Sequence, residues 1–281
     1  MVATAYSFDP DDPRAPTERQ WAEMSEGERA AIVAALPSSM PWELHPPEGD
    51  SHREPKDNAR ESLGEHFRRK GRRVYVSSEL VTYYPGARRF CPDVLAVVDV
   101  ETHKRESWIV AKEGKGLDFV LEVHVSGDID KDFERNVTFY ASLGIPEYFA
   151  FDGPRGRLWG WRARPGAPAT YERLVPQGGR LRSVVLGLEL TVEGGRVRFY
   201  EGSAPLLFVD ELVGRLEKMV DELISARDAA LGRAEGEARR AEDQARRAED
   251  QARRAEDQAR RASELEKEVA RLREELDRSK R

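Results

Sequence analysis

The sequence has little that would tie the protein to a membrane, a disulfide framework or a cysteine-based metal site. Its single cysteine is Cys91, so neither an intrachain disulfide nor a cysteine zinc site can form. No stretch approaches the roughly 18 consecutive apolar residues of a membrane span. The first residues also lack the basic start and apolar run of a signal peptide. We therefore expect a soluble, cytoplasmic protein with no membrane partner.

Four motifs of common enzyme classes are also missing. The chain has no GxxxxGK[ST] phosphate loop, no GxGxxG fingerprint after a strand, no HExxH zinc helix and no GxSxG serine nucleophile. The sequence therefore does not support a P-loop enzyme, a dinucleotide-binding fold, an HExxH metalloprotease or a serine hydrolase.

Charge is abundant but unevenly spread. Charged residues make up 35% of the 281 residues, and the formal net charge is −6. Residues 233–281 contain 15 Lys and Arg against 14 Asp and Glu, so the acidic excess lies in the preceding residues. An acidic balance argues against a protein that coats nucleic acid non-specifically, because phosphate contacts require Lys and Arg. An enzyme with one local basic groove remains compatible with it.

Composition and hydrophobic pattern divide the chain into three predicted segments. Residues 1–45 form an extension with one helix, capped by Thr17 and ended by Pro37. Residues 46–205 alternate helix and strand signals, which predicts a mixed α/β (α+β) domain. We expect a proline-rich loop over 38–56, helices over 57–70 and 130–143, and strands over 74–84, 92–100, 118–126, 147–152 and 157–163, followed by hairpins that turn at residues 194–195.

The third segment, residues 206–281, is predicted to be one long helix. The heptapeptide RRAEDQA occurs three times in register over residues 239–259, and small or apolar residues recur in steps of three and four. This pattern indicates a coiled coil over 216–276, through which the protein would bind a second copy or a partner protein. Arg227 interrupts the seam. The alternative is a solvated single helix held by ion pairs, since alanines bury little area.

Two carboxylates stand where an apolar strand would bury them. Asp93 begins the run PDVLAVVDV (92–100), and Glu122 lies inside DFVLEVHVS (118–126). A buried carboxylate is costly without compensation, and two on adjacent strands would repel each other. A divalent cation between them removes the penalty, and Mg²⁺ (or Mn²⁺) is the ion expected for oxygen ligands. Taken alone, Asp93 could also be a turn cap at the start of a strand.

These runs, read in order, resemble the Uma2 family (Uma-two), a restriction-endonuclease-like family of the PD-(D/E)xK nuclease superfamily. The likeness rests on PD, then E about 28 residues later, and most distinctively on GIPEYFAFD (144–152). Further similar pieces are EGDSH (48–52), SSEL (77–80) and LRSVVLGLEL (181–190). The resemblance covers about residues 40–200. It implies a restriction-endonuclease-like mixed sheet flanked by helices.

The resemblance also implies roles for particular residues. Asp93 and Glu122 would ligate the metal ion, and the Val123 carbonyl and Glu79 are further candidate ligands. His52 would be an outer member of the site.

The lysine of the superfamily is not in its usual places. The position two residues after the glutamate is His124, and the family's alternative lysine position in the following helix is Asn136. His124, which shares a strand face with Glu122, or Lys131 would then assist the attacking water, and Asn136 could hold a water. We expect the remaining polar and aromatic candidates to be structural rather than catalytic: Tyr140, Glu147, Asp152, Trp159 and Trp161.

Two functions of different classes follow. The first is a metal-dependent endonuclease that hydrolyses DNA phosphodiester bonds. The second is a non-catalytic scaffold with a nuclease fold, which associates through the coiled coil. A third reading, another metal hydrolase or a transposon-linked accessory factor, is also open. Metal binding discriminates the first two, because a scaffold has no reason to keep two apposed carboxylates.

Overall fold

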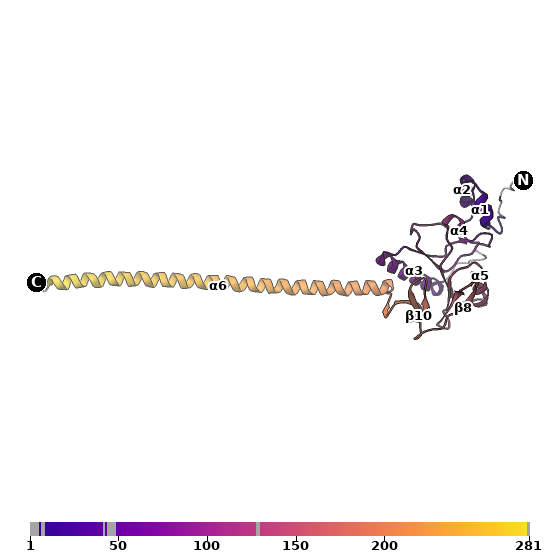
Figure 1. The fold of residues 1–281 in the computed structure, drawn as a ribbon. Helices are drawn as coiled ribbons and strands as arrows, with labels where there is room; N and C mark the ends of the chain where they lie inside the picture. Colours follow the sequence, from indigo (N-terminus) through magenta and orange to yellow (C-terminus); the bar gives the residue numbers. More distant parts are fainter. Residues whose placement is uncertain (1–5, 7–8, 42, 44–48, 128–129, 280–281) are drawn as a thin grey trace. The chain divides into compact units, whose positions relative to one another are not determined.

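The computed structural model describes residues 6, 9–41, 43, 49–127 and 130–279. The chain divides into two compact units, Met1–Leu212 and Val213–Arg281. The first unit contains the strands and most of the helices, and the second is the greater part of one helix, α6 (Val209–Ser279) (Figure 1). The predicted domain boundaries at 45/46 and 205/206 stay predictions.

A mixed six-stranded sheet forms the centre of the first unit, in the order β1-β3-β5-β6-β7-β8. The β5–β6 pair is parallel and the other four pairs are antiparallel. A helical crossover joins β5 to β6, as a parallel pair requires. The strands are β1 (Val74–Ser78), β3 (Val94–Val98), β5 (Phe119–His124), β6 (Glu147–Asp152), β7 (Arg157–Arg164) and β8 (Ala167–Arg173).

Two smaller sheets complete the unit. The antiparallel sheet β12-β11-β10-β9 contains β9 (Leu181–Ser183), β10 (Leu188–Glu193), β11 (Arg196–Glu201) and β12 (Ala204–Pro205). Its β10–β11 hairpin turns at Gly194 and Gly195, both at positive φ, which confirms the predicted turn. A short parallel pair joins β2 (Thr82–Tyr83) to β4 (Trp108–Ile109), and α4 (Val110–Glu113) follows.

The central strands are buried on both faces. In β3, Val94 and Ala96 pack into a core with helix α3 (Asp50–Lys70) and the four-stranded sheet. Leu95 and Val97 point the other way, into a core with α5 (Asn136–Ser142). This two-sided burial explains why these strands read as continuous apolar runs. It also leaves the strand ends between α3 and α5 as the place where polar groups can gather.

The N-terminal residues pack onto the same unit. Helices α1 (Glu18–Glu23) and α2 (Glu26–Ala35) both begin with a capping box, from Thr17 and Ser25. Ala15 and Leu36 are buried in a third core cluster with Val81, Tyr83 and Ile109.

Four of the predicted elements need correction. The predicted loop over 38–56 is wrong at its end, because α3 begins at Asp50 and runs through Pro55. The single helix over 17–37 is two helices, because Ser25 starts a second cap. The strand over 74–84 breaks at Glu79, whose φ of 51° lies in the left-handed region. The helix over 130–143 begins with a π-helical turn, η1 (Lys131–Arg135). Residue 48 of the EGDSH motif and residues 128–129 lie outside the described residues.

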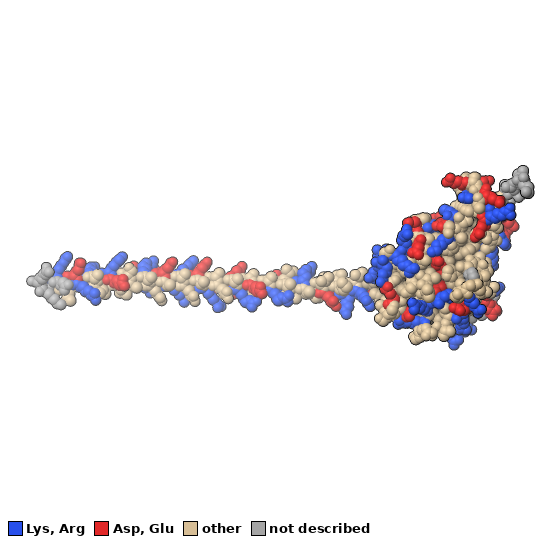
Figure 2. Space-filling view, viewed as in Figure 1, with Lys and Arg blue, Asp and Glu red and all other residues tan. Residues whose placement is uncertain are grey.

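Helix α6 is continuous from Val209 to Ser279, as the repeat pattern predicts. Charges of both signs are distributed along it (Figure 2). Among the described residues, every helix is too short or too polar to span a bilayer.

Candidate functional site

Three carboxylates lie in one row across neighbouring strands. The antiparallel pairings of β1 with β3 and of β3 with β5, continued by one residue, bring Glu79, Asp93 and Glu122 side by side. Asp93 and Glu122 are only 5% and 6% exposed. The Asp93 backbone N–H donates to Glu122 Oε2 at 3.3 Å, and the Val123 N–H donates to Asp93 Oδ2 at 2.7 Å. The strand backbone therefore fixes both buried carboxylates.

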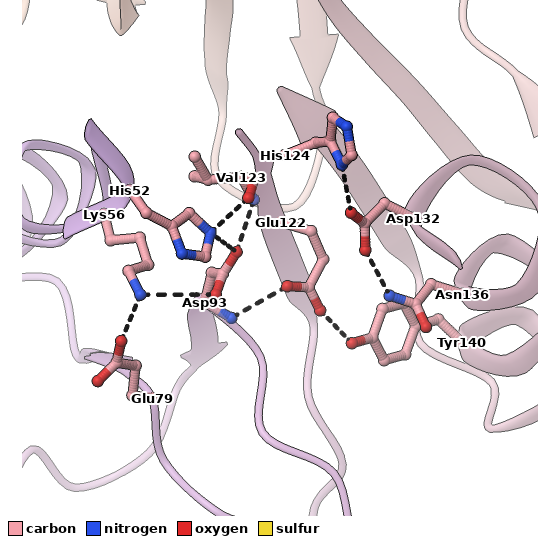
Figure 3. Close-up of polar contacts among 10 residues, drawn as sticks. All are labelled: His52, Lys56, Glu79, Asp93, Glu122, Val123, His124, Asp132, Asn136 and Tyr140. Carbon is pink, nitrogen blue, oxygen red and sulfur yellow. Dashed lines mark hydrogen bonds and ion pairs between the residues drawn. The ribbon is translucent and has the colours of Figure 1, made fainter. Parts of the chain in front are cut away.

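Helix α3 supplies two basic side chains to this row, one turn apart (Figure 3). His52 Nε2 donates to the Val123 carbonyl at 2.5 Å and lies 3.3 Å from Asp93 Oδ2. Lys56 is 2% exposed, forms an ion pair with Glu79, and holds its Nζ 3.8 Å from Asp93 Oδ1. A buried lysine of this kind requires anionic partners, and here it has two.

Polar groups from η1 and α5 approach from the other side. The Tyr140 hydroxyl donates to Glu122 Oε1. His124 Nδ1 lies 3.2 Å from Asp132 Oδ2, and Asn136 Nδ2 donates to Asp132 Oδ1 at 3.2 Å. Asp132 thus links the last residue of β5 to α5. All five of these side chains are buried.

The two central carboxylates differ in their electrostatics. Burial raises the pKa of Glu122 well above its usual value, and the nearby Asp93 and Asp132 carboxylates raise it further. Burial also acts to raise the pKa of Asp93, but hydrogen bonding and charge from His52, together with Lys56 and the Val123 N–H, bring its net pKa below the usual value. Burial raises the pKa of Asp132. Basic groups of α3 therefore act on Asp93, while burial dominates the pKa values of Glu122 and Asp132.

A cavity of about 440 Å³ opens beside Glu122. Its lining includes three cations and three carboxylates, as well as Asn136 and Tyr140. The charged residues are Arg88, Arg89, Lys131, Asp11, Asp12 and Glu122. The Arg89 guanidinium also donates to the Ser39 carbonyl at 3.2 Å. The three cations can donate to phosphate oxygens, and the carboxylates of Asp11, Asp12 and Glu122 balance their charge.

Comparison with protein families gives a match over the core of this structure. The family model of Uma2, described as "putative restriction endonuclease", matches residues 41–193, more than half of the chain. The chain belongs to the Uma2 family. Among solved structures, it is similar to the crystal structure of a "putative nuclease belonging to DUF820" from Anabaena variabilis. That protein is 14% identical, with 47% of this chain and 73% of that chain covered and a TM-score of 0.36. Comparison with curated proteins gave no match.

The fold of this Uma2 protein is the predicted mixed sheet flanked by helices. The structure brings Asp93, Glu122 and the Val123 backbone together with His52, which the sequence had placed in a loop. Glu79 is also adjacent, and it forms an ion pair with Lys56.

The other predicted site residues lie on the α5 side. His124 faces Asp132, Asn136 donates to Asp132, and Lys131 lines the cavity. The structural roles expected for Glu147 and Asp152 agree with their contacts, since Glu147 binds Arg162 and Ser183, and Asp152 binds Arg155. Trp161 stacks on Tyr148, as expected for a packing residue.

Sequence reasoning missed Lys56 and Asp132, and it treated Tyr140 as core alone. Lys56 follows His52 by four residues, a spacing that places both on one face of a helix. This spacing is informative only when the helix is known to begin before Pro55, as α3 does. Asp132 likewise precedes Asn136 by four residues. The Tyr140 ring is in the core, but its hydroxyl reaches Glu122.

The donor set of this Uma2 site fits a magnesium ion. Asp93, Glu122 and the Val123 carbonyl offer hard oxygen ligands, and a divalent cation would offset the repulsion between the two buried carboxylates. No trio of His, Cys, Asp or Glu side chains among the described residues is arranged to hold a metal by itself. An ion here would need backbone, solvent or substrate oxygens as well, which is the usual way in which proteins hold Mg²⁺.

Proposed function

We propose that this Uma2 protein is a magnesium-dependent endonuclease that hydrolyses DNA phosphodiester bonds. The observation that carries the proposal is the buried pair of Asp93 and Glu122, fixed by the strand backbone beside a cavity lined by both cations and carboxylates. Family membership supports the same reaction class.

Asp93, Glu122 and the Val123 carbonyl would hold the ion, and Mn²⁺ would fit the same oxygen ligands. When bound, the ion would stabilise the charge that develops on the phosphodiester and favour ionisation of the attacking water. Tyr140 orients Glu122 through its hydroxyl, and His52 orients Asp93 and the Val123 carbonyl. These donors preorganise the ligands, which lowers the cost of assembling the site.

The cavity would receive the phosphate backbone. Arg88, Arg89 and Lys131 would contact it there, next to the carboxylates of Asp11 and Asp12. Lys131 lies close enough for its charge to act on Glu122 and on Asp132. It can therefore offset negative charge that develops on the substrate, the work done by the missing superfamily lysine.

His124 is the candidate for handling the proton of the attacking water. It lies two residues after Glu122 on the same strand face, and Asp132 fixes its ring through Nδ1. Because the hydrogen bond to Asp132 occupies Nδ1, Nε2 is the ring nitrogen that can exchange a proton with water. Lys56 acts on the other side, where it keeps Asp93 ionised and in place.

The test is plasmid nicking by the full chain with Mg²⁺ or Mn²⁺. We expect the wild type to convert supercoiled plasmid to nicked or linear forms, and Asp93→Asn and Glu122→Gln to lose this activity by at least a hundredfold, a scale typical of losing an essential electrostatic group. The matched control is Asp99→Asn, near the other end of β3. Asp99 is exposed and at positive φ, where Asn is well tolerated, so its activity should be unchanged.

Calorimetric titration of metal into the same variants separates binding from chemistry. Metal binding by the wild type without cleavage of DNA would overturn the endonuclease and favour a non-catalytic nuclease-fold protein. Cleavage that persists in both site variants would show that the activity belongs to other residues or to a contaminant.

A further inference from the structure

The large apolar residues of α6 are concentrated towards its two ends. In the unit 213–281 the large apolar side chains named below are 45% to 67% exposed. They are Val213, Leu216, Met219, Val220, Leu223, Ile224 and Leu231 at one end, and Leu265, Val269, Leu272 and Leu276 at the other. Apolar surface of this extent indicates an association site.

One heptad frame connects both ends without a break. In steps of seven residues from Val213, position a falls on Val220 and, towards the other end, on Val269 and Leu276. Counting from Leu216 gives Leu223, Leu265 and Leu272 at position d. A straight α-helix drifts about 20° per heptad against this period, so the two ends share one face only if the helix supercoils. One frame that fits the apolar residues at both ends is therefore typical of a coiled coil, although position d between the ends is polar at Glu237, Gln244, Gln251 and Gln258.

The residues at a and d influence the number of strands. Apart from Leu276 at the last a position, the large apolar residues at a are valines and those at d are leucines, which in parallel coils favours two strands. Between them, position a is alanine in five successive heptads from residue 234 to residue 262. Arg227 and Glu237 are charged core positions, and Arg227 has a local partner in Asp228 at 2.8 Å. The middle of the seam is thus weak, and the two ends supply its attraction.

Charges at the flanking positions favour the same arrangement. In a parallel pair, residue g of one helix faces residue e of the next heptad in the other helix. Arg261 then faces Glu266, and Glu268 faces Arg273, so both pairs attract. Five successive g positions are arginines: residues 233, 240, 247, 254 and 261. A parallel pair sets the first four against alanines at e. An antiparallel pair would set g against g and bring arginines together.

We propose that residues 213–276 form a parallel, in-register two-stranded coiled coil with a second copy of this chain. The occupant of the exposed face is a second copy because one frame supplies matching apolar ends and complementary g and e charges from a single sequence. This proposal does not depend on the proposed nuclease activity.

The first test is disulfide trapping in the full chain by Leu272→Cys. In a parallel, in-register dimer the two d positions face each other closely enough for a disulfide. We expect most of the variant to become a covalent dimer under mild oxidation. Glu274→Cys, at the outward f position, should crosslink at least tenfold less, and the wild type reports any crosslinking through Cys91. A dimer in solution that Leu272→Cys fails to crosslink would overturn the parallel register.

The second test measures mass and uses charge reversal. Light scattering at micromolar concentration should give the mass of a dimer, and Arg273→Glu should weaken dimerisation at least several-fold. Adding Glu268→Arg to Arg273→Glu should restore it, because the reversed pair attracts again. A monomeric wild type would overturn the proposal and leave a helix that serves a different partner. Failure of the double variant to recover would refute the assigned g–e pairing.

Discussion

Lys56 provides the sharpest test of the electrostatics of the site. Its ammonium is 2% exposed and lies 3.8 Å from Asp93 Oδ1. At an effective dielectric constant of about 20, two unit charges at this separation attract by about 4 kcal/mol. Replacing the lysine also recovers its own desolvation cost, so the net loss is smaller. We expect Lys56→Met, which nearly conserves volume, to lower the free energy of unfolding by about 3 kcal/mol without metal.

Metal binding should respond in the opposite direction. Lys56 compensates the same carboxylates that a divalent cation would, so its removal relieves repulsion between two cations. Lys56→Met should therefore bind Mg²⁺ several-fold more tightly than the wild type, and saturating Mg²⁺ should recover part of its lost stability. A purely structural role for Lys56 predicts loss of stability with no gain in metal affinity.

The assay is urea unfolding followed by tryptophan fluorescence, with and without Mg²⁺, together with calorimetric titration of the metal. All five tryptophans precede residue 212, so their signal reports on the first unit alone. The control is Lys115→Met, because Lys115 is 34% exposed and its ammonium pairs with Asp118 at 2.9 Å and donates to the Val98 carbonyl at 2.6 Å. We expect it to cost about 1 kcal/mol or less. The reasoning is refuted if Lys56→Met costs no more than the control and leaves metal affinity unchanged.

Three further predictions concern single groups. Tyr140→Phe leaves Glu122 without its hydroxyl donor and should cost about 1–3 kcal/mol in urea unfolding. Tyr200→Phe removes a part-buried hydrogen bond to the exposed Glu193 and should cost less; equal losses would contradict this. Gly160→Ala would put a Cβ 2.8 Å from the buried Phe149 ring and should cost about 1–3 kcal/mol, while Gly27→Ala, with open space in helix α2, should be neutral or stabilising. Hydrogen bonding to Arg198 lowers the pKa of Glu211 to about 2, so the pair stabilises the fold above pH 4.5 and loses this contribution as the pH falls towards 2. Glu211→Gln should cost about 1 kcal/mol at pH 7 after allowance for solvent screening, and the difference from wild type should shrink at pH 3 in urea unfolding; a constant difference would exclude the linkage.

The sheet was largely predictable because its strands carry their own signal. Strand β6 was predicted with its observed bounds, and β3 and β5 lie inside their predicted runs. These strands are buried on both faces, so each is a run of apolar residues that needs no knowledge of its neighbours. Asp93 and Glu122 could be noticed for the same reason, as carboxylates that interrupt such runs.

The other half of the site could not be derived in this way. Pro55 and the prolines before it indicate a loop, yet the packing of α3 between two sheets extends the helix back to Asp50. Pro55 is the sixth residue of α3, past the first turn, so it gives up one intrahelical N–H bond, a cost that the packing of the helix has to offset. The role of Lys56 depends on its ion pairs with Glu79 and Asp93. These two carboxylates meet only through the strand register, which no local sequence pattern encodes.

The core of the first unit includes residues on both sides of the range that the family model matches. The family match ends at residue 193, while β11 begins at Arg196 and buries Val197 and Phe199 in the core beneath α3. At the other end, Ala15 and Leu36 cover Tyr83 and Ile109. In a fragment cut at residues 41 and 193, β10 would become an edge strand, and the apolar residues that β11 and the N-terminal segment cover would be exposed. Such a fragment should aggregate. We therefore expect that the matched region of this chain folds on its own only when the flanking segments before residue 41 and after residue 193 are included.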